Sequence, residues 1–496
     1  MSEVRGGINM PNVILITTDQ QRYDTLGCNG NSFIHTPNLD EIAAQGARFE
    51  RAYCTNPVCT PSRVSIMTGQ LPSHHGSYNI GTVAADTSGF LSSVLTDAGY
   101  RTHQLGKAHF YPWDTASPET RRPDGMEPFY DFAGFETAEL SVGHSDWGVN
   151  SHYEKWLEEK GIRKGRHMPQ LQVKRLFPND PYQSGDWGMP VNCHSGAWLV
   201  DRAEHFLRDR PKDRPFYLNI GFQDPHHPLA VPEEWPKIPE DTIPDPEGAF
   251  DPGLAHLKAL SEGRIEEAFG GRYGIAGNQD TVWKDVPVEI RKKVRSYYYS
   301  MVELFDRQIG ELIALLKKYE VFEDTLLMIT SDHGDMLFDH GLGEKGPMVF
   351  EEVLRVPLIM GLPGRIRPQT VSEPVSLADL YPTVLDYLGL FAETFCDGIS
   401  LRPLLEGGAM TRKGVQAEFM EEKDAIRYRC FMTKEWKLAE YPGESFGELY
   451  HLTEDPKEQH NLWAEPEYLM IKYELLRQYL QEIQRQEPAA QRPCRC

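Results

Sequence analysis

The feature that most constrains the fold is a set of short apolar runs, each followed by polar residues, that recurs along the 496-residue chain. The first run covers residues 13–16, reads Val-Ile-Leu-Ile and is followed by Thr17, Thr18 and Asp19. Runs this short suit a strand that is buried on both faces and are too short for a typical helix. We therefore predict buried strands here and at the similar runs 216–222, 326–330 and 356–360.

Amphipathic segments separate these runs. Between residues 302 and 316, apolar side chains recur at the spacing of one helical face, at Val302, Phe305, Ile309, Leu312, Ile313 and Leu316. Strands that alternate with helices are typical of a mostly parallel sheet covered by helices. The sequence therefore predicts an α/β fold.

The pattern changes near residue 390 to shorter β-like pieces, at 427–432 and 436–440. They are followed by a helical spacing of apolar residues, which we expect to pack against the molecule: Leu469, Tyr473, Leu476, Tyr479, Leu480 and Ile483. We predict a large domain over residues 1–390 and a smaller α+β subdomain over residues 391–496.

Two regions lack a regular pattern. Residues 113–192 are rich in Trp, Tyr, Pro and Gly, and residues 228–252 hold seven prolines among acidic residues. Proline lacks the backbone N–H group that helices and central strands need. We expect both regions to be surface insertions beside a functional site.

Charge and composition exclude several classes of protein. The chain has 51 Lys and Arg against 73 Asp and Glu, a formal charge of −22, which argues against a nucleic-acid or anionic-membrane partner. We find no signal peptide and no apolar segment of membrane-spanning length, so we expect a cytoplasmic location. The eight cysteines are too sparse for a disulfide framework. The oligomeric state stays open.

The most informative motif is Cys59-Thr60-Pro61-Ser62-Arg63. Thr60 can cap a helix that begins at Pro61, and Gly69 can end that helix. Cys59 would then lie just outside a helix N-terminus, where free amides and the helix dipole activate a nucleophile. Two simpler interpretations are a buried structural cysteine and a disulfide with Cys54.

This motif resembles the Cys-x-Pro-Ser-Arg signature of the type I sulfatases, a family of the alkaline phosphatase superfamily in which the cysteine is converted to formylglycine. The resemblance extends over nearly the whole chain, through segments 12–20, 36–40, 106–109, 225–228, 331–334, 345–346, 379–383, 448–452 and 455–462. It implies an alkaline-phosphatase-like mixed, mostly parallel sheet with a small C-terminal subdomain. It also implies a formylglycine-generating enzyme as a partner during maturation.

A metal site is expected where two of the predicted strands end. Asp19 follows the first strand, and Asp332-His333 follows the run 326–330, so both lie at the carboxyl edge of a parallel sheet. Carboxylates with one imidazole suit Ca²⁺, Mg²⁺ or Mn²⁺. By resemblance Cys59 joins these ligands, and Gln20 stands where many sulfatases have a second aspartate. We expect Ca²⁺, with Mn²⁺ or Mg²⁺ as alternatives.

The resemblance also assigns roles to residues that could bind an anion and move protons. Lys107 and Lys345 match sulfate-contacting lysines, Arg63 steadies formylglycine, and His109 and His226 handle protons. The implied reaction is hydrolysis of a small anionic sulfate ester, in which a hydroxyl of hydrated formylglycine, its pKa lowered by the cation, attacks sulfur. The alternative is a phosphonate monoester or phosphodiester hydrolase with the same nucleophile.

Overall fold

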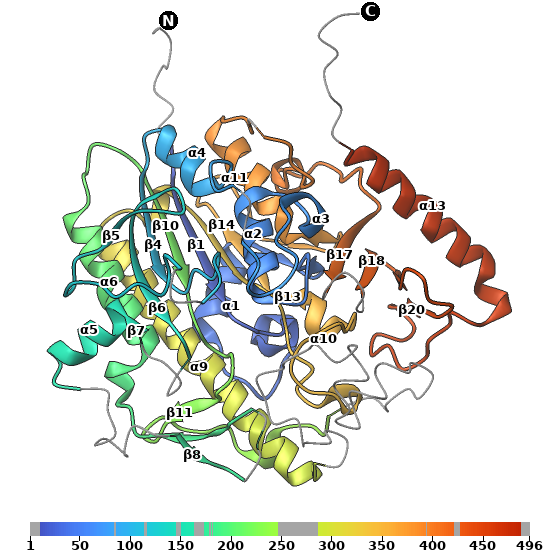
Figure 1. Cartoon of the computed structure of the whole chain (residues 1–496), viewed down its shortest axis with the longest axis horizontal. Helices are drawn as coiled ribbons and strands as arrows, with labels where there is room; N and C mark the ends of the chain where they lie inside the picture. The colour runs from blue at the N-terminus through green and yellow to red at the C-terminus, as the bar shows by residue number, and fades with distance from the viewer. Residues whose placement is uncertain are drawn as a thin grey trace, which may run out of the picture.

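The computed structural model describes residues 10–83, 86–113, 117–144, 150–162, 173–177, 180, 182–246, 286–392, 394–420 and 427–487. Within these residues the main sheet has ten strands (Figure 1). Its centre is five adjacent parallel strands in the order β12, β1, β10, β4, β6. They cover Thr325–Ser331, Asn12–Thr18, Phe216–Gly221, Arg101–Gly106 and Phe135–Val142.

Shorter strands extend this centre on both sides. Beside β12 the order continues β14, β2, β15, and β5 and β7 pair with β6. Their bounds are Leu358–Gly361, Ala47–Phe49, Gln369–Val371, Phe129–Phe132 and Asn150–Ser151. The strands β14, β2, β5 and β7 each run antiparallel to the neighbour nearer the centre, and β15 runs parallel to β2. The sheet is therefore mixed and mostly parallel, as predicted.

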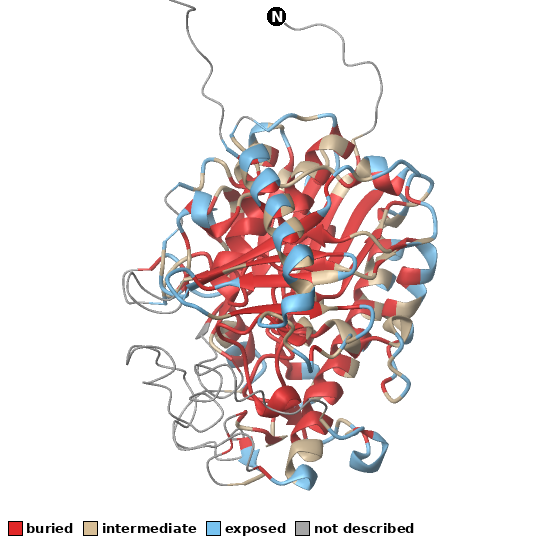
Figure 2. Ribbon diagram, turned by 90° about the vertical axis from the view of Figure 1, so that its right-hand side faces the viewer, coloured by how far each residue is buried: buried red, intermediate tan, exposed pale blue. Residues whose placement is uncertain are grey.

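Helices cover both faces of the sheet because alternate side chains of each central strand point to opposite faces. In β1, Val13 and Leu15 join one buried cluster, and Ile14 and Ile16 join another. The helices α2 (Cys59–Thr68), α4 (Leu91–Asp97) and α11 (Leu380–Leu388) pack in the first cluster. The second cluster contains α1 (Pro37–Gln45), α6 (Ser195–Asp209) and α9 (Val288–Lys318). Figure 2 shows the strands between these layers as buried.

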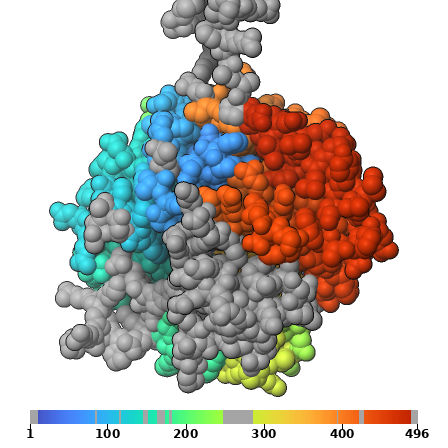
Figure 3. Space-filling view, turned by 45° about the vertical axis from the view of Figure 1, so that its right-hand side comes forward, coloured from blue at the N-terminus to red at the C-terminus, as the bar shows by residue number. Residues whose placement is uncertain are grey.

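The C-terminal part forms a separate antiparallel sheet of strands β17 to β20, with the long helix α13 beside it. These elements cover Gly414–Met420, Arg427–Thr433, Trp436–Glu440, Gly447–His451 and Leu469–Arg485. In Figure 3 this part, in red, forms one side of the molecule. Its buried residues, such as Ala417 and Cys430, belong to the same cluster as Val13 of the main sheet. The domain boundary at residue 390 stays a prediction.

The remaining elements are short. Two further three-stranded sheets hold β8, β9, β11 and β3, β13, β16, at Val173–Arg175, Gly185–Trp187, Ala230–Pro232, Ala52–Tyr53, Arg355–Val356 and Val375–Ser376. The short helices are α3, α5, α10 and α12, at Pro72–His75, His152–Glu159, Glu351–Leu354 and Arg402–Leu405. Among the described helices, none combines the length and the apolar character needed to cross a membrane.

Two predictions about irregular regions are wrong in part. The segment 113–192 contributes β5 and β6 to the main sheet. In the proline-rich segment, residues 228–232 are buried rather than exposed, and β11 pairs with β9 there. Residues 247–252 of that segment lie outside the described residues.

The helix α13 forms where predicted, but its expected packing face is only partly correct. Tyr479 is buried, whereas Leu469, Tyr473 and Leu480 have exposed fractions of 58%, 61% and 54%. The helix packs on the small sheet through Leu475, which clusters with Leu438 and Leu449.

Candidate active site

The site lies at the carboxyl edge of the five central strands, because parallel strands end at the same edge of a sheet. Asp332 follows β12 and Asp19 follows β1. His226 lies in the segment after β10, and Lys107 follows β4 directly. The edge therefore gathers residues that are up to 313 positions apart, from Asp19 to Asp332.

Cys59 is the first residue of α2 and Val58 is its N-cap, so the predicted cap at Thr60 was placed two residues too late. The first helical hydrogen bond runs from Ser62 N to Val58 O, at 3.3 Å. Thr60 therefore lies inside the first turn, where its hydroxyl is buried without a partner among the described residues. Pro61 is tolerated there because first-turn amides have no helical acceptor. Gly69 ends the helix at φ +69°, as predicted.

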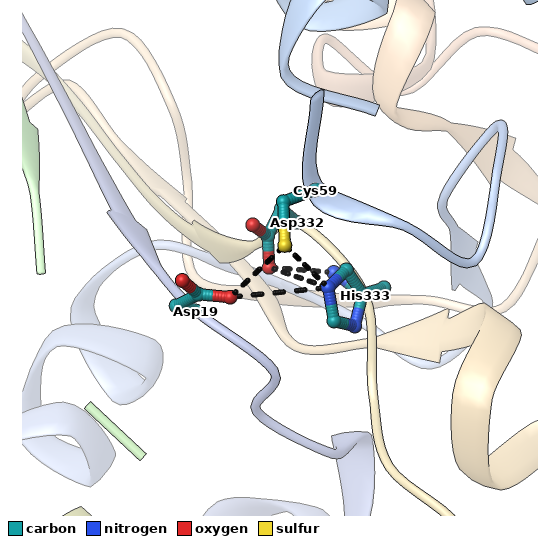
Figure 4. Close-up of side chains that lie close together, drawn as sticks. All are labelled: Asp19, Cys59, Asp332 and His333. Atoms are coloured by element: carbon teal, nitrogen blue, oxygen red, sulfur yellow. Dashed lines mark hydrogen bonds and ion pairs between the residues drawn. The ribbon is translucent and has the colours of Figure 1, made fainter. Parts of the chain in front are cut away.

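Cys59 is a free thiol, and the disulfide with Cys54 is excluded because Cys54 is also free. The Cys59 Sγ atom lies 3.2 Å from His333 Nε2 and 3.6 Å from Asp19 Oδ1 (Figure 4). Burial raises the pKa of the Cys59 thiol, against the opposing effect of Lys345.

One atom from each of four buried side chains could ligate a cation here. The ligand atoms of Asp19, Cys59, Asp332 and His333 all lie within 4.8 Å of one another. His333 Nδ1 lies 2.9 Å from the carbonyl oxygen of Gly334. A carbonyl only accepts, so Nδ1 carries the proton and Nε2 directs its lone pair to the cluster. Two carboxylates, a sulfur and this imidazole fit a divalent cation.

Asp332 is held by its neighbours on both oxygens. Its Oδ2 accepts from Arg63 Nε at 2.7 Å, and its Oδ1 accepts from the backbone N–H of Gln20 at 3.0 Å. Burial alone would raise the pKa of Asp332, but Arg63, then His333 and Lys107, lower it well below its usual range. The carboxylate is therefore fixed in its charged form.

Lys345 connects the cluster to the histidines. Its Nζ atom lies 3.5 Å from Cys59 Sγ, 2.7 Å from Gln20 Oε1 and 2.9 Å from His226 Nε2. His226 Nδ1 contacts the carbonyl oxygen of His227, so His226 Nε2 accepts the bond from Lys345. The amide oxygen of Gln20 is occupied by Lys345, and its role as a metal ligand stays a prediction.

Lys107 and His109 lie in the segment that follows β4. Lys107 Nζ forms an ion pair with Asp19, and burial lowers the pKa of Lys107 to about 7. His109 is buried, and its Nδ1 has no partner in the described part of the chain. Its ring stacks on Trp113 with a centroid distance of 4.5 Å. Glu119 accepts a hydrogen bond from Trp113 Nε1 at 3.0 Å and so fixes the position of the indole ring.

Sequence reasoning missed His144, which lies two residues after β6. Its Nε2 is 3.3 Å from Lys107 Nζ and 4.0 Å from Asp19 Oδ2. The one signal in the sequence is the alternation of apolar and polar residues over 138–142, which is weaker than the continuous apolar run before Asp19. The interpretation of residues 113–192 as irregular concealed it.

Known proteins resemble this chain over most of its length. The sequence profile of the Sulfatase family matches residues 11–390, and the profile of the N-sulphoglucosamine sulphohydrolase C-terminal region matches residues 339–486. An arylsulfatase of Clostridium perfringens is 29% identical, with 92% of this chain and 91% of the relative covered. An N-acetylglucosamine-6-O-sulfatase of Bacteroides thetaiotaomicron is 26% identical over 96% of this chain and 86% of the relative.

Among solved structures, the phosphonate monoester hydrolase of Agrobacterium radiobacter matches with a TM-score of 0.81 and 24% identity. The match covers 97% of this chain and all of that chain, and it establishes the alkaline-phosphatase-like fold. The chain belongs to the sulfatase family, because the family profile covers most of its length. It is thus a sulfuric ester hydrolase.

Proposed function

We propose that the chain hydrolyses sulfate monoesters with position 59 as the nucleophile, after conversion of Cys59 to formylglycine. The observation that carries this proposal is the position of Cys59 at the start of α2, with Asp19, His333 and Lys345 within 3.6 Å of its sulfur. A formylglycine-generating enzyme would be the maturation partner. The substrate would be a small anionic sulfate ester, and the location would be cytoplasmic.

A divalent cation fits the donor set of Asp19, Asp332, His333 and position 59. When bound, it would supply positive charge that lowers the pKa of a hydroxyl at position 59. Oxygen-rich ligation favours Ca²⁺, with Mn²⁺ or Mg²⁺ as alternatives. Arg63 orients Asp332 through the 2.7 Å bond to its Oδ2.

The chain's own cations would bind the sulfate group. The ammonium group of Lys107 contacts Asp19, and that of Lys345 lies 3.5 Å from Cys59 Sγ. Both lysines are buried, with exposed fractions of 1% and 7%. Buried ammonium groups attract an anion strongly because water does not screen them. This local positive charge would allow an anion to bind although the whole chain has a formal charge of −22.

Proton transfer is assigned to the two histidines. Lys345 Nζ donates a hydrogen bond to His226 Nε2 across 2.9 Å, so this pair holds a proton that can pass to the departing alcohol oxygen. Burial lowers the pKa of His109 well below its usual value. His109 is therefore neutral, and its Nδ1 or Nε2 can take the proton of the second hydroxyl at position 59.

The second candidate is a phosphonate monoester or phosphodiester hydrolase with the same nucleophile. It is favoured by the fold match to the Agrobacterium radiobacter enzyme. Both reactions transfer a tetrahedral oxyanion, so the buried lysines suit either. The arylsulfatase and N-acetylglucosamine-6-O-sulfatase relatives, which extend over most of this chain, favour the sulfatase.

A turnover screen of sulfate monoesters against phosphate diesters and phosphonate monoesters tests the proposal. The mature protein should carry formylglycine at position 59 by mass spectrometry and should prefer sulfate monoesters. Cys59→Ala should abolish turnover without unfolding the chain, because it removes the nucleophile and only a small buried volume. Activity of Cys59→Ala near that of the wild type, or a strong preference for phosphodiesters, would overturn it.

A further inference from the structure

Six side chains follow one another in a closed ring that includes Cys59. Asp19 and Lys345 are its neighbours, Lys107 contacts Asp19, and His226 contacts Lys345. His144 closes the ring. Its Nε2 lies 3.3 Å from Lys107, and its ring stacks on His226 with a centroid distance of 4.0 Å and an interplanar angle of 10°.

The charge around His144 favours an anion rather than a second cation. Asp19, His144 and His226 do place potential ligand atoms within 4.8 Å of one another. However, the ammonium of Lys107 lies 3.3 Å from His144 Nε2, and that of Lys345 lies 2.9 Å from His226 Nε2. Two ammonium groups at these distances repel a metal ion and attract an oxyanion.

His144 also has an unused polar atom. The side chain is buried, with an exposed fraction of 4%, and its Nδ1 has no hydrogen-bond partner in the part of the chain that the structure describes. The Lys107 ammonium only donates, so Nε2 accepts from it and the ring proton lies on Nδ1. Buried donors without a partner are rare in folded proteins. The lack of a partner for this N–H group is therefore evidence for a ligand that accepts a hydrogen bond from it.

We propose that His144 is a further substrate-contacting residue, whose Nδ1–H donates a hydrogen bond to an oxygen of the bound sulfate ester. The inference rests on the proposed sulfatase function and adds a donor between Lys107 and His226. Because an ester oxyanion accepts strongly, this contact would contribute to ester and sulfate binding as well as to turnover.

Three variants of His144 separate this contact from packing. His144→Phe keeps an aromatic ring against His226 but removes both nitrogens. His144→Asn retains a donor near the position of Nδ1, and His144→Gln retains a polar group near Nε2. The control is His103→Phe, another buried histidine that stacks on an aromatic ring, Phe206, outside the site.

Each mature, cation-loaded variant is assayed for kcat and KM with a sulfate monoester and for inhibition by inorganic sulfate. We expect His144→Phe to raise KM and to weaken sulfate inhibition by about 10-fold to 100-fold, the effect of losing one hydrogen bond to a charged group. His144→Asn should recover most of this loss, and His144→Gln should not. His103→Phe should leave KM and sulfate inhibition unchanged.

Two results would overturn the inference. Wild-type KM and sulfate inhibition in His144→Phe would show that His144 does not touch the anion. Recovery by His144→Gln and not by His144→Asn would show that His144 acts only by positioning Lys107. A wild-type protein without sulfate-ester turnover would instead contradict the proposed function itself, so the two failures are distinguishable.

Discussion

The carboxylate of Asp332 joins two parts of the site. One oxygen accepts from Arg63, and the other accepts from the backbone N–H of Gln20 and lies 3.8 Å from His333 Nε2. Arg63 and Asp332 together are almost fully buried. Removing the carboxylate charge would therefore affect both the cation donors and the arginine beside them.

We predict that Asp332→Asn lowers the bound divalent cation well below one equivalent per chain and lowers turnover with it. Elemental analysis of the purified variant measures the first effect, and a sulfate-ester assay measures the second. Asp379→Asn is the matched control, because Asp379 is equally buried and also pairs with an arginine, Arg412, but lies outside the donor cluster. A full complement of cation in Asp332→Asn would contradict the metal assignment.

The Lys345 and His226 pair allows a second prediction at the scale of single residues. A general acid matters most when the departing alkoxide is basic, whereas an anion-binding group matters for every ester. His226→Ala should therefore reduce turnover of alkyl or sugar sulfates far more than that of nitrophenyl sulfate. Lys345→Ala should reduce both, because Lys345 Nζ also lies 3.5 Å from Cys59 Sγ.

The comparison of both variants on both esters decides between the roles. An equal loss for His226→Ala on good and poor leaving groups would make His226 an anion-binding residue. A selective loss for Lys345→Ala would make the lysine the general acid.

At the scale of elements, the ends of three central strands were predictable, whereas the central strands β4 and β6 were not predicted. The runs that form β1, β10 and β12 are apolar on both faces, so their sequence identifies them. By contrast, β6 carries Glu136 and Glu139. Glu136 pairs with Arg101 and Arg214, and Glu139 pairs with Arg202. These arginines come from other segments, so the local pattern does not reveal a buried strand.

The residues of the candidate site also divide into those that the local pattern predicts and those that it does not. Asp19 and Asp332 follow apolar runs directly, and this position alone predicts that they meet at one sheet edge. The resemblance supplied Lys107, His109, His226 and Lys345. His144 was missed because it depends on β6. Its proximity to Lys107 follows from the pairing of β4 with β6, which residue spacing does not contain.

The helix α13 supports a prediction about stability. Leu475 is 4% exposed and packs with Leu438 and Leu449, whereas Tyr473 and Leu480 are more than half exposed. Leu475→Ala should lower the free energy of unfolding by about 2 kcal/mol or more. Tyr473→Gln and Leu480→Gln should change it by roughly 0.5 kcal/mol or less. Urea unfolding followed by circular dichroism measures each value, and equal losses in the three variants would contradict this packing.

At the scale of the whole molecule, the small C-terminal sheet supports the segment that leads into the nucleophile. Glu418 N, on β17, donates to Thr55 O at 2.8 Å, and Asn56 Nδ2 donates to Glu418 O at 2.7 Å. Asn56 Oδ1 in turn accepts from Val58 N at 2.9 Å, directly before Cys59. The C-terminal sheet therefore fixes the segment that leads into α2.

The same region should make global stability depend on pH. His75 Nδ1 accepts from Ser77 N at 3.1 Å, and its Nε2 lies 3.0 Å from Ser65 Oγ on α2. Burial lowers the pKa of His75 to about 3 from the 6.5 of an unfolded chain. Between these values the unfolded state binds more protons than the folded state. The stability contributed by neutral His75 is thus complete above pH 6.5 and is lost as the pH falls toward 3.

We predict that His75→Asn makes the decline of stability with acid less steep. The free energy of unfolding of the wild type should fall faster than that of the variant between pH 6 and 4.5, by about 1.4 kcal/mol per pH unit for one proton. His460→Asn, at an exposed histidine, is the control and should follow the wild type. Urea unfolding at several pH values gives both slopes. Parallel slopes for the wild type and His75→Asn would show that His75 is not protonated on unfolding in this range.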